Sequence, residues 1–165
     1  MSRTILLPLL ALLMLAGSAH AEERGFGAGI IVGETAGLSV KKWLGGGAGV
    51  DGGLSWSGGG DQTVRLHIDY LRHNYRLLRE VAPKGAGTRL SVFYGIGGDA
   101  KIDNITSNDI TSDDVDLGIR FPVGINYLFR DAPMGIFAEL VPTLAVRPET
   151  EFKWGGAVGI RYYFR

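Results

Sequence analysis

His67 and Asp69 are the two residues whose types and spacing come nearest to a catalytic arrangement. They lie two positions apart, so in an extended strand their side chains share one face. A serine hydrolase needs a nucleophile, a histidine base and a carboxylate that orients the histidine, all within hydrogen-bonding reach. The sequence pattern presents no serine beside this pair. We therefore interpret the pair as polar filling of a protein interior, with Arg65 or Arg120 as a partner, and predict no catalytic residue.

A second group of chemically active side chains is acidic. Between residues 99 and 114 only Lys101 offsets the carboxylates. Clustered carboxylates can bind a hard cation such as Ca²⁺, but their spacing here fits no calcium-loop pattern. We predict an exposed, solvated loop without a metal ion. The acidic residues of this predicted loop are Asp99, Asp103, Asp109, Asp113 and Asp114.

The composition limits the remaining classes of function. The chain has 165 residues, enough for one domain, with 26 glycines and no cysteine. The absence of cysteine excludes disulfides, thiolate metal sites and cysteine nucleophiles. The 17 acidic residues balance 17 basic ones. This balance argues against a nucleic-acid partner, because nucleic-acid-binding proteins carry a basic excess.

The first 21 residues form a segment separate from the predicted domain. Arg3 precedes an apolar run over residues 5–16, and small residues stand before a cleavage site after Ala21. This order is typical of a secretory signal peptide. The apolar run is shorter than the roughly 20 residues that a membrane-spanning helix needs. We predict that this segment is removed on export and that residues 22–165 form the mature domain.

Large apolar residues recur at every second position through most of the mature chain. Period two predicts β-strands, and eight strands with turns between them are what a small closed barrel requires. Closure also removes the unpaired edges of a sheet. The predicted fold is an all-β, eight-stranded, antiparallel up-and-down transmembrane β-barrel after an N-terminal signal peptide. The strands are expected near residues 26–32, 38–44, 48–56, 64–70, 90–96, 117–129, 136–144 and 154–164.

The second face of these strands predicts which side of the barrel contacts lipid. It consists mainly of glycine and other small residues, with a few large charged ones. Glycine weakens a solvent-exposed strand, whereas the narrow interior of an eight-stranded barrel needs small residues beside a few long ones. We therefore expect the bulky face to contact lipid and the charges to pair inside a lumen that conducts little. This predicted lumenal charge network contains Asp51, Arg65, His67, Asp69, Arg120, Glu139 and Arg161.

Aromatic residues fall near the ends of the predicted strands, as in the aromatic girdles of membrane barrels. Trp43 and Lys42 depart from this arrangement. By the alternation of the strand, the Trp43 side chain should point into the lumen and the Lys42 side chain toward lipid. We expect either a bulge at the end of the second strand or a lysine that snorkels. Pro122, inside the sixth strand, predicts a second bulge. The aromatic residues expected at the periplasmic rim are Phe26, Tyr127, Phe129, Tyr162 and Phe164, and those at the outer rim are Trp56 and Trp154.

The C-terminal residues carry the most specific motif. Gly159 is followed by aromatic residues at alternating positions, Tyr162 and Phe164. This pattern resembles the closing-strand signal that the assembly machinery of bacterial outer-membrane barrels recognises. It departs from that signal at Ala157, where a polar residue is usual, and at Arg165, which follows the terminal aromatic residue.

Together with the strand pattern, this motif makes the mature chain resemble the small OmpA-like and OmpX-like barrels over its whole length. Stretches such as residues 42–44 and 122–129 are similar, more narrowly, to an uncharacterised family of such bacterial barrels. The resemblance implies an exported outer-membrane protein, with no settled activity to carry over.

Three functional hypotheses follow. The favoured one is a non-enzymatic integral outer-membrane barrel with a structural or surface-interaction role through its extracellular loops. The first alternative is an outer-membrane lipid-modifying enzyme that uses His67, and the second is a soluble lipocalin-like barrel with its apolar face inward. The expected partners are outer-membrane lipid, the barrel assembly machinery and an extracellular partner of the loops. We expect a monomer without a cofactor and without nucleic acid.

Overall fold

The computed structural model describes residues 25–33, 36–57, 63–78, 89–103 and 115–164. The predicted signal peptide and its cleavage site lie outside these ranges. The described part of the chain forms one antiparallel sheet, and it contains no helix long and apolar enough to span a membrane. The strands are β1 (Phe26–Gly33), β2 (Ala36–Gly45), β3 (Ala48–Ser57), β4 (Thr63–Asn74), β5 (Leu90–Ile102), β6 (Val115–Arg120), β7 (Val123–Leu128), β8 (Met134–Arg147) and β9 (Glu151–Phe164).

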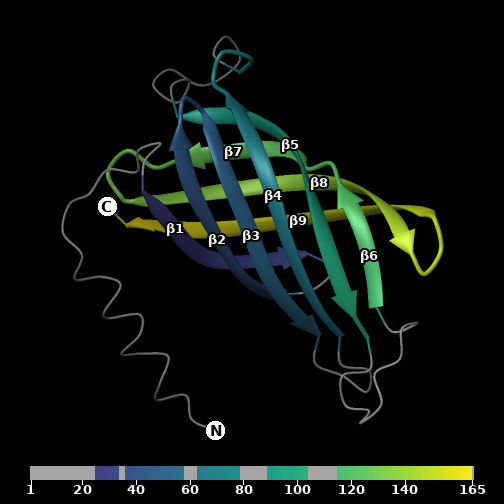
Figure 1. Ribbon diagram of the computed structural model, residues 1–165. Coiled ribbons are helices and arrows are strands. Elements are labelled where there is room, and N and C mark those ends of the chain that lie inside the picture. The colour runs from purple at the N-terminus through teal and green to yellow at the C-terminus, as the bar shows by residue number, and fades with distance from the viewer. Residues whose placement is uncertain (1–24, 34–35, 58–62, 79–88, 104–114, 165) are drawn as a thin grey trace, which may run out of the picture.

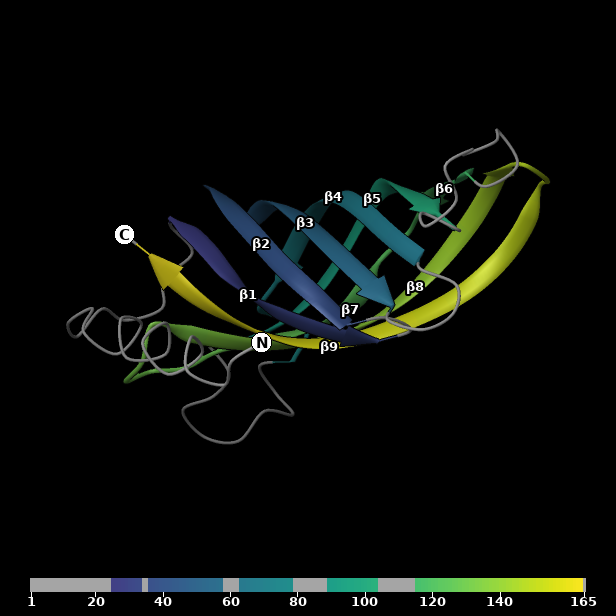
Figure 2. The ribbon, with the colours of Figure 1, turned by 90° about the horizontal axis from the view of Figure 1, so that it is seen from below.

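The sheet closes on itself into a barrel (Figures 1 and 2). Strands β1 to β5 pair in sequence, β8 pairs with β9, and β9 returns to pair with β1. Strands β6 and β7 both lie between β5 and β8, where they are arranged end to end. They fill one position of the ring, so the barrel has the eight positions that the sequence predicts.

Pro122 separates β6 from β7, but it is not the predicted bulge. The partners of Arg120 and Val123 on β5 are Gly97 and Tyr94. The segment from β6 to β7 and the facing segment of β5 therefore advance by the same number of residues across the break. The register against β8 is continuous in the same way. Pro122 therefore removes a backbone N–H donor without inserting an extra residue, and the prediction of a bulge there is wrong.

The two ends of the barrel are defined by the strands that begin and end there. At the end that contains Gly25 and Phe164, here called the terminal end, a tight turn joins β2 to β3. Gly45, Gly46 and Gly47 all have positive φ angles, of 91°, 60° and 75°, which favours glycine at each position. At the opposite end, here called the loop end, β1, β3, β5 and β8 end at Gly33, Ser57, Ile102 and Arg147.

The outward face of the barrel is mainly apolar between its two rims. Exposed side chains include Ile68 at 64% and Trp154 at 68% of their full accessibility. Aromatic rings pack along both rims. The ring centres of Phe26 and Phe164 lie 6.4 Å apart at the terminal end, and those of Phe152 and Trp154 lie 5.4 Å apart at the loop end. This arrangement is opposite to that of a soluble lipocalin-like barrel, whose apolar residues face inward.

Glycines on the inner face make room for large side chains of the neighbouring strand. A Cβ atom at Gly27 would lie 2.6 Å from the ring of Tyr163, and one at Gly124 would lie 2.6 Å from the ring of Phe93. At Gly53 a Cβ would collide with the imidazole of His67. The glycine-rich second face of the sequence is thus the packed interior of a narrow barrel.

The departure predicted at the end of β2 has a structural explanation. Trp43 points inward and is 3% exposed, and Lys42 points outward at the rim. The register of β2 against β3 shifts between Trp43 and Gly45. The bulge therefore lies after Trp43 and leaves the parity of both residues unchanged.

Candidate functional site

The candidate site is the charged interior of the barrel. The structure places all seven residues of the predicted lumenal network on the inner face, where six are buried and Arg65 is partly exposed. The strands position these residues because alternate side chains of each strand point inward. The six buried members are Asp51, His67, Asp69, Arg120, Glu139 and Arg161.

Arg161 of β9 forms the most buried ion pair of the lumen. Its Nη2 atom lies 2.7 Å from both carboxylate oxygens of Asp51. Its Nε and Nη2 atoms also donate to the Ser39 hydroxyl, at 2.9 and 2.7 Å. The guanidinium plane lies over the Phe137 ring at 3.8 Å, close enough for a cation–π contact.

Arg120 of β6 binds two carboxylates from other strands. Its Nε donates to Asp69 Oδ1 of β4 at 3.1 Å, and its Nη2 lies 3.6 Å from Glu139 Oε1 of β8. The three side chains are at most 6% exposed. Asp69 is therefore engaged by the fixed cation of Arg120.

Asp99 lies in β5 and not in an exposed loop, which corrects the sequence-based assignment. Its side chain is 6% exposed and lies 3.2 Å from Arg65 Nε. The β4–β5 register brings Asp99 opposite His67, which places its carboxylate inside the barrel. The sequence could not show this because β5 continues to Ile102, beyond the last clear apolar alternation.

Asp103, directly after β5, is the next acidic residue of that predicted loop. Its carboxylate accepts hydrogen bonds from Lys101 Nζ at 2.7 Å and from Thr63 Oγ1 at 2.5 Å. Partial burial raises the pKa of the Asp103 carboxyl, but the two hydrogen bonds and the nearby cations outweigh burial and hold the pKa below its ordinary value. The remaining residues assigned to the loop, Asp109, Asp113 and Asp114, lie outside the described residues.

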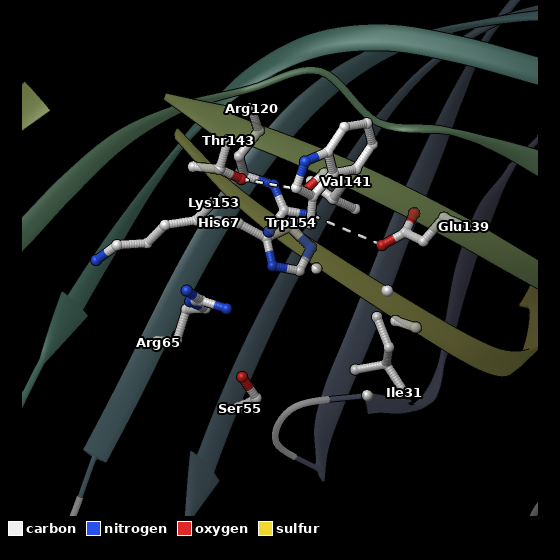
Figure 3. A pocket seen from close by; sticks show the side chains of 14 residues that line it. Ile31, Ser55, Arg65, His67, Arg120, Glu139, Val141, Thr143, Lys153 and Trp154 are labelled. Carbon is white, nitrogen blue, oxygen red and sulfur yellow. Dashed lines mark hydrogen bonds and ion pairs between the residues drawn. The ribbon is translucent and has the colours of Figure 1, made fainter. Parts of the chain in front are cut away.

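A cavity of about 90 Å³ lies in the lumen toward the loop end, and it is here called the vestibule. Figure 3 shows Arg65 and Lys153 on one side of it and Glu139 on the other. Lys153 also contacts Asp116 and Glu151, at 3.4 and 3.6 Å. The polar side chains that line the vestibule are Ser55, Arg65, His67, Arg120, Glu139, Thr143 and Lys153.

A second polar cluster, which the sequence reasoning missed, lies near the terminal end. Lys41 Nζ donates to His73 Nε2 at 2.9 Å, and His73 Nδ1 lies 3.2 Å from the Gly47 carbonyl. Because a carbonyl only accepts, Nδ1 carries the proton and Nε2 is free to accept. The His73 ring packs on Trp43, with ring centres 4.5 Å apart. The parity that Lys41 shares with Ser39 and Trp43 was the signal that could have placed it inside.

The residues of the predicted assembly signal occupy β9. Gly159 faces the lumen, where a Cβ would collide with the Phe137 ring. Tyr162 and Phe164 lie at the terminal rim with their ring centres 5.0 Å apart. Within the described ranges, no group of three or more histidine and acidic side chains could hold a metal ion.

The architecture can be compared with solved structures. It is similar to the N-terminal β-barrel domain of Pseudomonas aeruginosa OprF, with a TM-score of 0.60 and 14% sequence identity over 84% of this chain and 95% of that domain. The chain has the fold of the small outer-membrane barrels. Acinetobacter baumannii CarO2 also matches, with a TM-score of 0.42 and 14% identity over 86% of this chain and 99% of that one. No protein-family model and no curated protein matches the sequence.

Proposed function

We propose that this protein is a non-enzymatic, integral outer-membrane β-barrel whose lumen is closed. The proposal rests on how apolar and charged side chains are distributed between the two faces of the barrel. The outward face is apolar and bounded by aromatic rims, and the inward face contains buried, paired charges. Water would not stabilise such a surface, whereas the hydrocarbon core of a membrane would.

The orientation follows from the strand ends and the export signal. Residues 1–21 act as a signal peptide cleaved after Ala21, and the terminal end with its short β2–β3 turn faces the periplasm. The loop end then faces the cell exterior. The connection between β4 and β5, residues 75–89, departs from the short periplasmic turns that are usual in such barrels. The pattern of Gly159, Tyr162 and Phe164 would be read by the barrel assembly machinery, and the barrel would be a monomer in outer-membrane lipid.

Closure of the lumen is supported by successive layers of side chains below the vestibule. Arg120 links Asp69 and Glu139, and Arg161 links Asp51 and Ser39. At the terminal end, the buried side chains of Trp43, Leu128 and Tyr163 pack together. These layers leave the protein a structural role or a surface-interaction role, in which the extracellular loops bind a partner.

Cell fractionation tests the membrane location. The full-length chain is expressed, membranes are washed with carbonate, and the pellet is run on a gel with and without boiling. We expect a carbonate-resistant protein with heat-modifiable migration. Recovery as a soluble protein with unchanged migration would overturn the proposal.

Two further measurements test the closure of the lumen and the absence of enzymatic activity independently. In planar bilayers we expect the folded barrel to show no stable ion conductance, and regular conductance steps would refute a closed lumen.

Mass spectrometry of lipid A from cells with and without the gene should show unchanged acylation. A change in acylation that depends on His67 would instead favour the lipid-modifying enzyme.

A further inference from the structure

We infer that an anionic phospholipid of the periplasmic leaflet binds at one defined place on the outer surface of the barrel. The inference rests on the proposed membrane location and orientation. The place is an apolar groove of about 790 Å³, here called the lipid groove. It crosses the strands from Phe26 and Lys42 at the terminal end to Val146 near the loop end of β8.

Small residues on the outward face create the lipid groove. In the register of β2 to β5, Val40 lies opposite Gly52, Gly52 opposite Ile68, and Ile68 opposite Gly98. Two glycines thus alternate with two bulky residues in one row, on strands that lie side by side (Figure 1). A Cβ atom at Gly98 would have its nearest neighbour at 3.6 Å. The row is therefore hollowed at its glycines, and a flexible hydrocarbon chain can lie in it.

Two exposed cations stand at the terminal end of the lipid groove. Lys42 lines the groove, and both Lys42 and Arg72 point outward. Lys42 lies opposite Val50, Val50 lies opposite Tyr70, and Arg72 is two positions beyond Tyr70. The spacing of strands and of residues along them then places the Cα atoms of the two cations roughly 12 Å apart. Two long side chains at that separation can reach one phosphate group between them.

No carboxylate of the described residues neutralises these two cations. The ion pairs that the structure describes involve neither Lys42 nor Arg72. At the terminal end the one acidic residue described is Asp131, which follows Arg130 in the connection between β7 and β8. That connection belongs to the side of the barrel opposite β3. The two cations are therefore available to an anionic headgroup, which lysine and arginine near a membrane surface attract.

The acidic residues that border the lipid groove do not oppose an anion in it. Asp51 and Asp99 contribute to its floor, but their side chains are buried in the lumen. There Asp51 contacts Arg161 at 2.7 Å, and Asp99 contacts Arg65 at 3.2 Å. The outward surface of the groove is thus apolar along its length and positively charged at the periplasmic rim, which matches the chain and the headgroup of an anionic phospholipid.

A second copy of the barrel fits this surface less well. In a two-fold dimer within a membrane, residues at equal depth face each other across the axis. Lys42 and Arg72 would then approach the same two cations of the other copy, and like charges disfavour such an interface. A phospholipid brings the opposite charge to the same position.

Another hollow on the outward face provides an internal comparison. It has a volume of about 530 Å³ and is lined by residues of β1, β5, β7, β8 and β9, among them Ile30 and Ala138. None of the described residues that line it is charged. We expect it to accept hydrocarbon chains without regard to the headgroup.

The test uses the mature barrel in nanodiscs of phosphatidylcholine that contain a small fraction of spin-labelled lipid. The nitroxide is placed in the middle of an acyl chain of either phosphatidylglycerol or phosphatidylcholine, and the broadening of backbone amide signals is followed by NMR. We expect stronger broadening at Gly52 and Gly98 from labelled phosphatidylglycerol than from labelled phosphatidylcholine, and equal broadening by the two lipids at Ala138. Equal broadening by the two lipids in the lipid groove would overturn the inference.

Variants separate a built site from general attraction to the periplasmic rim. K42Q and R72Q should each lower the preference for phosphatidylglycerol at Gly98 about fivefold. R130Q removes an exposed cation at the same end but on the other side of the barrel, and it should leave the preference unchanged. An unchanged preference in both K42Q and R72Q, or an equal loss in R130Q, would refute the site.

Filling the lipid groove tests the position of the chain. Gly98→Leu places a side chain in the open space above Gly98 and should reduce the broadening at Gly52 by labelled phosphatidylglycerol. Undiminished broadening would show that the chain lies elsewhere. Because the protein lacks cysteine, Gly98→Cys adds a single thiol. We expect it to stay monomeric on oxidation in vesicles, and efficient disulfide dimers would show a second copy in the groove and overturn the inference.

Folding is checked separately from lipid binding. Heat-modifiable migration of each variant from the same nanodiscs shows that the barrel is folded and inserted, and K42R and R72K keep the charge if a glutamine variant does not fold. K42R and R72K should retain the preference for phosphatidylglycerol, and its loss in both would count against recognition by charge. A folded, inserted barrel without lipid preference would refute this inference and leave the proposed membrane location intact.

Discussion

Removal of the Arg161 guanidinium should destabilise the barrel more than removal of any exposed cation. Arg161 is 2% exposed, and its Nη2 lies 2.7 Å from both oxygens of the Asp51 carboxylate, which is itself 4% exposed. In Arg161→Met the side-chain volume is largely kept, but Asp51 and Ser39 lose their buried donor. Breaking one side of a buried ion pair costs about 3–5 kcal/mol, and the contact with Phe137 at 3.8 Å adds to the loss.

The assay is urea unfolding of the refolded barrel in lipid vesicles, followed by tryptophan fluorescence and gel migration. The reference variant is Arg147→Ala at an exposed position of β8, which should change the free energy of unfolding by less than about 0.5 kcal/mol. The double variant Arg161→Met with Asp51→Asn removes both charges. It should therefore recover about 2 kcal/mol relative to Arg161→Met alone, since no buried carboxylate is left without a cation.

Three results would contradict this reasoning. One is an Arg161→Met variant as stable as Arg147→Ala, and another is a double variant whose destabilisation equals the sum of the two single effects. If Arg161→Met does not fold, Arg161→Lys retains the charge without the two-nitrogen contact to Ser39 and should show a smaller loss. An Arg161→Lys variant that is as unstable as one lacking the charge would show that the ion pair is not what stabilises this layer.

Three further predictions follow from other layers of the barrel. Arg120→Ala should lower the unfolding temperature in micelles more than Arg147→Ala does, because Asp69 and Glu139 both lose their cation; equal effects would refute the buried network. Gly124→Ala should cost about 1–3 kcal/mol in urea unfolding, because its Cβ would collide with the carbonyl oxygen of Ala138 and lie 2.6 Å from the Phe93 ring. The control Gly98→Ala has its nearest neighbour at 3.6 Å, and a Gly124→Ala variant as stable as this control would show that the interior is not tightly packed. The lowered pKa of Asp103 means that its stabilising contribution is present above its unfolded pKa and is lost as the pH falls through its folded pKa. Asp103→Asn should accordingly be less stable than the unchanged protein at neutral pH, with the gap in unfolding temperature closing in acid; a gap that is independent of pH would contradict the lowered pKa.

Several features of the site depended on which strands become neighbours. The parity of Arg161 and Asp51 placed both residues in the lumen, but they are 110 positions apart in the chain, and the pairing appears only once β9 closes against β1. Asp99 illustrates the same limit. The sequence pattern placed this residue in a loop, and only its register opposite His67 brings its carboxylate to Arg65.

The Pro122 break shows a limit of local rules. A proline within a strand usually signals an edge or a bulge, yet the neighbouring strands keep one register across it. Pairing on both sides of the break holds the chain extended, so the missing N–H interrupts the ladder without shifting it. A residue's own conformational preference cannot report this constraint, because it comes from strands β5 and β8.

The sequence by itself determined the class of the fold and the orientation of its two faces. Period two and the contrast between bulky and glycine-rich positions are local properties, since a strand turns alternate side chains to opposite sides whatever its neighbours are. The tertiary structure decided which charges meet, where the vestibule lies and how Lys41, His73 and Trp43 pack at the terminal end. These contacts depend on the stagger between strands when the barrel closes, and that stagger is a property of the whole ring rather than of any one segment.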